Sequence, residues 1–192
     1  MKCVKCGKPA AVSVQNLESC DSCFQKIIEK RVRKEIRTNN LIDKDDKILI
    51  LDNGSAESQL SSYLLKRIIK DLPVKITIKK LDYTHGKALS GDFNKIIVPW
   101  NADLEDEYFL SCIFQNKEIE FLGHYKIDNK TYVKLFLPVL SSEVEVFAKI
   151  KKLDFKKNTK KSITQDMMDK LEKEYPETKF SLLSSAEQFR KK

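Results

Sequence analysis

The sequence lacks the features that would place it in several common protein classes. It has no run of about 18 apolar residues, which argues against a transmembrane helix, and residues 1–6 carry no apolar stretch of signal-peptide type. It has only two histidines, His85 and His124, each too isolated in the sequence to support a catalytic base. Because membrane-spanning and signal-peptide segments are missing, we expect a cytoplasmic protein with no membrane partner.

Acidic residues are in the minority. Lys and Arg exceed Asp and Glu by 8 among 192 residues, and residues 149–161 alone carry seven lysines. A basic surplus of this size favours an anionic partner, with RNA or DNA first. A lysine-rich surface that only keeps the chain soluble would give the same count. The hydrophobic fraction of 41% argues against disorder, and the length fits one domain, alone or with a small appendage.

Four of the five cysteines fall in the first 23 residues, as two CxxC pairs with 13 residues between them: Cys3, Cys6, Cys20 and Cys23. Each pair brings two thiolates of one tight turn to the same metal, and two pairs complete a tetrahedron. The spacing predicts a structural zinc ribbon, with an iron–sulfur cluster as the alternative. The fifth cysteine, Cys112, has apolar neighbours and is predicted to be a buried, inert thiol.

A helix is predicted directly after this cysteine module. The apolar residues Phe24, Ile28, Val32 and Ile36 recur every four residues, which indicates one narrow buried stripe. Basic residues occupy other positions of the same helix: Lys26, Lys30, Arg31, Arg33, Lys34 and Arg37. Cationic rows next to a zinc ribbon would suit a phosphate backbone, so we predict RNA binding here, against the alternative of a solvated helix face.

Short apolar runs alternate with helical patterns along the rest of the chain. The predicted strands are residues 47–51, 74–82, 95–99, 118–125 and 131–137, and the predicted helices are residues 58–71, 104–115, 142–152 and one beginning near residue 162. This alternation predicts an α/β fold around a mostly parallel sheet. In such a sheet, the loop after the first strand is the usual site for a phosphate.

The residues in that place are Asn53, Gly54, Ser55, Glu57 and Ser58, and the Walker pattern GxxxxGK[ST] is absent. The segment resembles the Ser-Gly-Gly-x-Asp-Ser loop of the PP-loop ATP pyrophosphatase superfamily, whose fold is of the adenine nucleotide alpha hydrolase-like type. Gly54 and Ser58 match that pattern, while Asn53, Ser55 and Glu57 replace its Ser, Gly and Asp.

Other segments resemble the tRNA 2-thiolation branch of that superfamily. They are the two CxxC pairs with the basic helix, residues 101–107, which are similar to its Asn-x-Asp-Asp-Glu element, residues 138–155, and residues 178–183, which are similar to its Gly-Thr-Lys-Phe-x-Leu-Leu. The resemblance implies a zinc ribbon in residues 1–24, a basic linking helix in residues 25–40 and a PP-loop domain in residues 41–192.

The departures from that branch concern its chemistry. Catalytic members carry cysteines in the middle of the α/β domain, where this chain has only Cys112, and Ser55 adds a Cβ where a glycine lets the backbone approach a phosphate. The chain therefore resembles the non-catalytic subunit of the cytosolic tRNA 2-thiolation complex, with tRNA and a catalytic PP-loop paralogue as partners and ATP binding doubtful. The alternatives are a divergent active thiolating enzyme and an unrelated zinc-ribbon nucleic-acid-binding protein.

Overall fold

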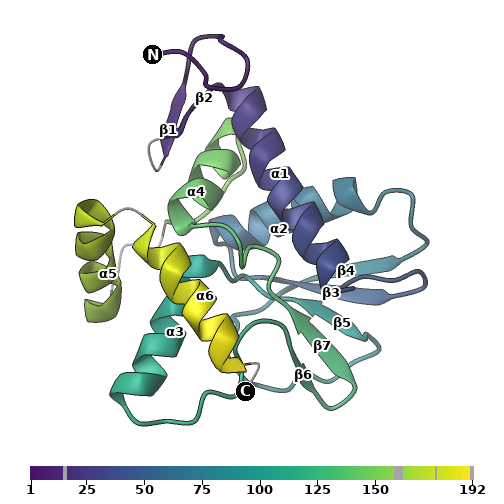
Figure 1. Cartoon of the computed structure of the whole chain (residues 1–192). Helices are drawn as coiled ribbons and strands as arrows, with labels where there is room; N and C mark the ends of the chain where they lie inside the picture. The colour runs from purple at the N-terminus through teal and green to yellow at the C-terminus, as the bar shows by residue number, and fades with distance from the viewer. Residues whose placement is uncertain (15–16, 158–161, 176, 191–192) are drawn as a thin grey trace.

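The computed structural model describes residues 1–14, 17–157, 162–175 and 177–190, and a five-stranded sheet lies at its centre (Figure 1). The strand order is β4 (Lys75–Lys80), β3 (Lys47–Asp52), β5 (Lys95–Ile97), β7 (Lys130–Val133) and β6 (Tyr125–Ile127). Neighbouring strands are parallel except β6 and β7, which pair antiparallel. The predicted α/β fold with a mostly parallel sheet is confirmed.

Both faces of the interior strand β3 are buried. Ile48 and Ile50 point into a cluster with residues of α1 (Asp21–Thr38), α2 (Ala56–Ile68) and α4 (Ser141–Ile150). Leu49 and Leu51 point into a second cluster on the opposite face, which is rich in aromatic side chains. Strands covered on both faces read as continuous apolar runs, which is why residues 47–51 were recognisable in the sequence.

The cysteines lie in a small module at one end of the molecule (Figure 1). A two-stranded antiparallel sheet, β1 (Val12–Val14) and β2 (Leu17–Ser19), leads directly into α1. Val12 and the α1 residues Phe24, Ile28 and Val32 are buried in the main cluster with the sheet. The module is therefore anchored to the α/β core through its own hairpin and through α1.

Residues 118–124 were predicted to form part of a strand, and this prediction is wrong. The alternation of Glu118, Ile119, Glu120 and Phe121 imitates a half-buried strand, but pairing with β7 begins only at Tyr125. Gly123 has a φ of +63°, outside the extended region, so the backbone leaves the sheet direction there. The segment instead brings Phe121 into the aromatic cluster.

Three helices pack together on one side of the molecule: α3 (Ala102–Phe114), α5 (Ile163–Glu174) and α6 (Thr178–Arg190) (Figure 1). The sequence predicted α3 and the capping box of α5, where Ser162 Oγ accepts from Gln165 N at 3.1 Å. It did not predict α6. No helix within the described ranges is long and apolar enough to cross a membrane.

The strand order reverses between β3 and β5, because the chain runs from β3 to β4 on one side and from β5 to β7 on the other. Ligands of open α/β sheets bind in the crevice at such a switch point, outside the carboxyl ends of the strands. The loops that begin at Asp52 and Val98 meet there.

Candidate functional site

The loop between β3 and α2 is organised around the carboxylate of Asp52, the last residue of β3. Asp52 Oδ1 accepts hydrogen bonds from Gly54 N at 2.8 Å and from Ser58 Oγ at 3.0 Å. It also accepts one from Gln59 Nε2 at 2.8 Å. The hydrogen-bond donors of this loop, which in a phosphate loop would face a bound phosphate, are thus directed at the carboxylate of Asp52.

Asp52 stays ionised in this position. Its burial would raise its pKa, but the hydrogen bonds from Gly54, Ser58 and Gln59 and the positive charge of Lys80 outweigh burial and lower the pKa below the usual 3.8. A phosphate that entered the loop would therefore face a fixed negative charge.

The remaining predicted loop residues shape the corner at the start of α2. Ser55 is the N-cap of α2, and its Oγ accepts from Ser58 N at 3.3 Å. Asn53 Oδ1 accepts from Ser55 N at 3.0 Å, which closes a tight turn. Gly54 has a φ of +80°, so the turn favours glycine at this position.

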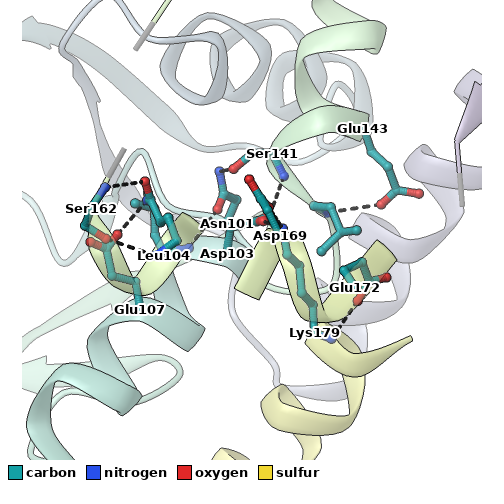
Figure 2. A network of polar contacts seen from close by, with 12 residues as sticks. Asn101, Asp103, Leu104, Glu107, Ser141, Glu143, Ser162, Asp169, Glu172 and Lys179 are labelled. Atoms are coloured by element: carbon teal, nitrogen blue, oxygen red, sulfur yellow. Dashed lines mark hydrogen bonds and ion pairs between the residues drawn. The ribbon is translucent and has the colours of Figure 1, made fainter. Parts of the chain in front are cut away.

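Glu57 turns away from the loop and joins the end of the neighbouring strand. Its Oε1 accepts from Asn101 Nδ2 at 2.6 Å, and the same amide donates to Ser141 Oγ at 2.8 Å. Asn101 Oδ1 caps α3 by accepting from Leu104 N at 3.0 Å. Asn101 is 1% exposed, and its contacts with Glu57, Leu104 and Ser141 connect α2, α3 and α4 at the switch point. Figure 2 shows Asn101 next to Ser141.

The network continues to the C-terminal helices through Asp103. Its Oδ2 accepts from Ser141 N at 2.7 Å, and its Oδ1 accepts from Lys179 Nζ at 2.6 Å (Figure 2). Lys179 Nζ also donates to Asp169 Oδ1 at 2.5 Å. Burial acts to lower the pKa of Lys179, but the two aspartates outweigh it and raise this pKa above 10.5. Residues of the predicted segments 101–107 and 178–183 are therefore brought into contact.

A lysine outside the loop covers Gly54. Lys156 N donates to Gly54 O at 2.8 Å, and the Lys156 side chain passes 3.5 Å from where a Cβ on Gly54 would lie. The loop itself contains no cation, as its sequence shows, but this residue of the predicted lysine-rich tract lies directly over it. Lys160 and Lys161 of that tract lie outside the described residues.

The four N-terminal cysteines converge as predicted. Their Sγ atoms all lie within 4.8 Å of one another, and Cys6 Sγ lies 3.6 Å from Cys20 Sγ. The tight turn after Cys3 is closed by Gly7 N, which donates to Cys3 O at 2.9 Å, and Gly7 has a φ of +72°. Four sulfurs about 2.3 Å from one tetrahedral zinc lie roughly 3.8 Å apart, so these spacings fit a single ion.

The predicted RNA-binding residues divide into two groups. Lys26, Lys30, Arg33, Lys34 and Arg37 are exposed along α1, away from its buried stripe. Arg31 instead lies between α1 and α4, where its guanidinium contacts both carboxylate oxygens of Glu143 at 2.9 Å. Since the Glu143 side chain is only 3% exposed, Arg31 belongs to the scaffold more than to the exposed surface.

A search with protein-family models finds no match. A stretch of 70 residues is 39% identical to the tRNA-5-methyluridine(54) 2-sulfurtransferase of Thermotoga maritima and 29% identical to that of Pyrococcus horikoshii. Each match covers 35% of this chain and only 23% of the relative. Among solved structures, the U34-tRNA thiolase NcsA from Methanococcus maripaludis with its [4Fe-4S] cluster superposes with a TM-score of 0.78 and 18% identity, over 98% of this chain and 87% of that one.

The chain shares its fold with this solved structure. The site within this fold differs from the sequence-based prediction in one main respect. The sequence pattern indicated that the Cβ of Ser55 would hinder phosphate binding. In the structure, Asp52 and Gln59 occupy the loop, and Glu57 points to Asn101. Asp52 stands directly before the motif in the sequence, so its carboxylate was the available signal that an anion of the chain itself could occupy the loop.

The fold also carries a buried carboxyl group that has no hydrogen-bond partner among the described residues. Asp106 on α3 is 1% exposed, and within the described residues neither of its carboxylate oxygens has a hydrogen-bond partner. Burial, and then the charges of Asp103 and Glu105, raise its pKa to about 8. The folded chain therefore keeps this proton up to about pH 8, while the unfolded chain releases it near pH 3.8.

We predict that Asp106→Asn stabilises the protein at pH 8. Because the pKa of Asp106 is higher in the folded chain than in the unfolded chain, the free energy of unfolding falls as the pH rises from about 4 to 8. The amide of the variant cannot ionise, so the variant avoids this loss. Urea unfolding should show a gain of roughly 5 kcal/mol at pH 8 that shrinks toward pH 4. Asp166→Asn, on the exposed side of α5, is the control and should change little. An equal gain at both pH values would contradict the prediction.

Proposed function

We propose that this chain binds tRNA and supports its 2-thiolation as a non-catalytic subunit, beside a catalytic PP-loop paralogue. The observation that carries this proposal is the occupation of the phosphate loop by Asp52, which accepts three hydrogen bonds from the loop and the first turn of α2. Adenylation of a uridine needs a phosphate held in that loop. A carboxylate already satisfied there opposes it by charge and removes its donors.

The position of the remaining thiol supports the same proposal. Cys112 is the one cysteine of the sequence outside the N-terminal cluster, and it is 5% exposed near the end of α3. The switch point lies at the other end of that helix, where Asn101 is the N-cap. A sulfur carrier has to reach the uridine as an accessible thiolate, and a buried thiol in an apolar setting is inert.

The cysteine module and α1 would supply tRNA contacts. Four converging thiolates suit one structural Zn²⁺, which leaves no open coordination position for chemistry. A [4Fe-4S] cluster binds each thiolate to a different iron and spreads the sulfurs more widely than a single ion does. The compact spacing therefore favours zinc here. The ion would fix the hairpin at the N-terminal end of α1, next to the exposed cations of that helix.

A divergent active enzyme is the second candidate, and one observation favours it. The 39% identity over 70 residues is to a sulfurtransferase whose name describes the reaction itself. The two functions differ in a direct assay. If the chain is a supporting subunit, purified chain with tRNA, ATP and a sulfur donor yields no thiolated uridine by nucleoside mass spectrometry, and adding a co-purifying PP-loop paralogue restores it. Thiolation by the chain alone would reverse the assignment.

Nucleotide binding gives an independent prediction. Calorimetry with Mg-ATP should show no binding tighter than about 1 mM for the wild-type chain, since Asp52 holds the loop donors. Asp52→Ala frees those donors and removes the charge, so ATP or pyrophosphate should bind at least roughly tenfold more tightly.

The control for that experiment is Asp82→Ala, which removes an equal charge from an exposed position just after β4. It should leave the affinity for ATP unchanged. Low-micromolar binding by the wild-type chain, weakened by Gly54→Val, would instead support the active enzyme.

A further inference from the structure

An apolar stripe runs along the exposed face of α5. Four apolar residues follow one another at intervals of four and therefore share one side of the helix: Ile163, Met167, Leu171 and the C-cap Tyr175. Their exposed fractions are 90%, 37%, 38% and 65%, in that order. No other helix within the described ranges exposes more than two large apolar side chains. Apolar groups that gather on one exposed face mark a surface for another protein.

The other side of α5 already holds the helix in place. Met168 is only 5% exposed. Gln165 Nε2 donates to Glu107 Oε2 of α3 at 2.6 Å, and Asp169 Oδ1 accepts from Lys179 Nζ of α6 at 2.5 Å. Figure 1 shows α5 at the outer edge of the molecule, with α3 and α6 on its inner side. The stripe therefore faces away from these contacts and is open to a partner.

Two exposed charges follow one edge of the stripe. Asp166 lies in the first turn of α5, and Lys170 lies one turn further on along the same edge. Neither forms an ion pair within the described residues. Thr164 and the buried Met168 occupy the opposite edge, which carries no charge. The charged edge is thus negative before the centre of the stripe at Met167 and positive after it.

A second copy of α5 complements this surface when the two helices run antiparallel. With Met167 on a two-fold axis, Ile163 of one copy lies opposite Leu171 of the other. Asp166 of one copy then lies beside Lys170 of the other, because this axis places the same edge of both helices on the same side. In a parallel pair, each charged edge would instead face the uncharged edge of the other helix. The order of the charges therefore favours the antiparallel pair.

We propose that two copies of this chain associate through α5, as an antiparallel helix pair with two-fold symmetry. The inference goes beyond the proposed function and does not depend on it. A pair of three-turn helices buries less than the roughly 1,200 Å² of a small stable interface, so we expect a weak dimer with a Kd on the order of 10–100 µM. Lys173 and Glu174 lie beyond the overlap of the two helices, and their charges stay in solvent.

Sedimentation equilibrium of the whole chain from about 5 to 500 µM tests the dimer, since this range spans the expected Kd. Met167→Glu places two carboxylates together on the two-fold axis and should weaken association at least about tenfold. Phe114→Glu is the matched control. It adds the same charge at an apolar residue that is 64% exposed at the end of α3, and it should leave the Kd unchanged. Far-UV circular dichroism checks that both variants are folded.

Charge reversal tests the antiparallel arrangement. Asp166→Lys alone should weaken the dimer roughly threefold to tenfold, because it brings lysines together across the interface. Adding Lys170→Asp reverses both charges and should restore the Kd. A chain that stays monomeric at the highest concentration would overturn the inference, and so would a dimer that Met167→Glu leaves intact or that Phe114→Glu weakens equally. If the double reversal does not restore association, the antiparallel pairing is wrong.

Discussion

Cys20→Ser is expected to abolish zinc binding and to unfold the N-terminal module while leaving the α/β domain folded. The module has few apolar contacts of its own, and structural zinc contributes about 10–16 kcal/mol in comparable finger peptides. The loss of one of four converging thiolates leaves an incomplete tetrahedron. Metal analysis should fall from one zinc per chain to near zero.

The α/β domain should survive that loss because α1 is held by its own packing. Phe24, Ile28 and Val32 are each no more than 1% exposed in the main core. Hydrogen exchange should therefore lose protection in residues 1–20 and keep it in α1 and β3. Cys112→Ser is the matched control, since this buried thiol lies outside the cluster and its replacement should keep the zinc. Iron in place of zinc in the wild-type chain would show that the metal assignment is wrong.

The features that the sequence predicted correctly are local ones. The two CxxC pairs specify their own convergence, because a tight turn brings both thiolates of a pair together wherever the rest of the chain runs. β3 was predictable because a strand buried on both faces is apolar at every position. The capping residue Ser162 likewise acts within its own helix, on Gln165.

The features that it missed depend on partners far away in the chain. Whether Asp52 points into the loop is set by Gln59 and by the turn at Gly54, and the motif alone does not contain that information. The prediction of a strand at residues 118–124 was wrong because an alternation of polar and apolar residues does not show whether a partner strand is available. Helix α6 was missed because what defines it is packing against α3, together with the ion pair from Lys179 to Asp103.

The exposed cations of α1 should dominate binding to tRNA. Each phosphate contact releases counterions, which gives a log–log salt slope of about −0.7 per contact on single strands. Lys30→Glu with Lys34→Glu should therefore flatten the slope by more than one unit and weaken binding roughly tenfold to a hundredfold near 0.1 M salt. Neither lysine has an ion-pair partner within the described residues, whereas Arg33 is partly neutralised by Glu29 at 2.8 Å.

Two comparison variants separate RNA contact from net charge and from folding. Lys66→Glu with Lys70→Glu makes the same charge change at exposed positions of α2 and just beyond it, and should alter the slope much less. Arg31→Ala should lower stability by a few kcal/mol, because it leaves Glu143 buried without its cation, and should change tRNA affinity little. If the α1 and α2 pairs weaken binding equally, binding depends on net charge alone, and α1 is only a solvated face of the protein.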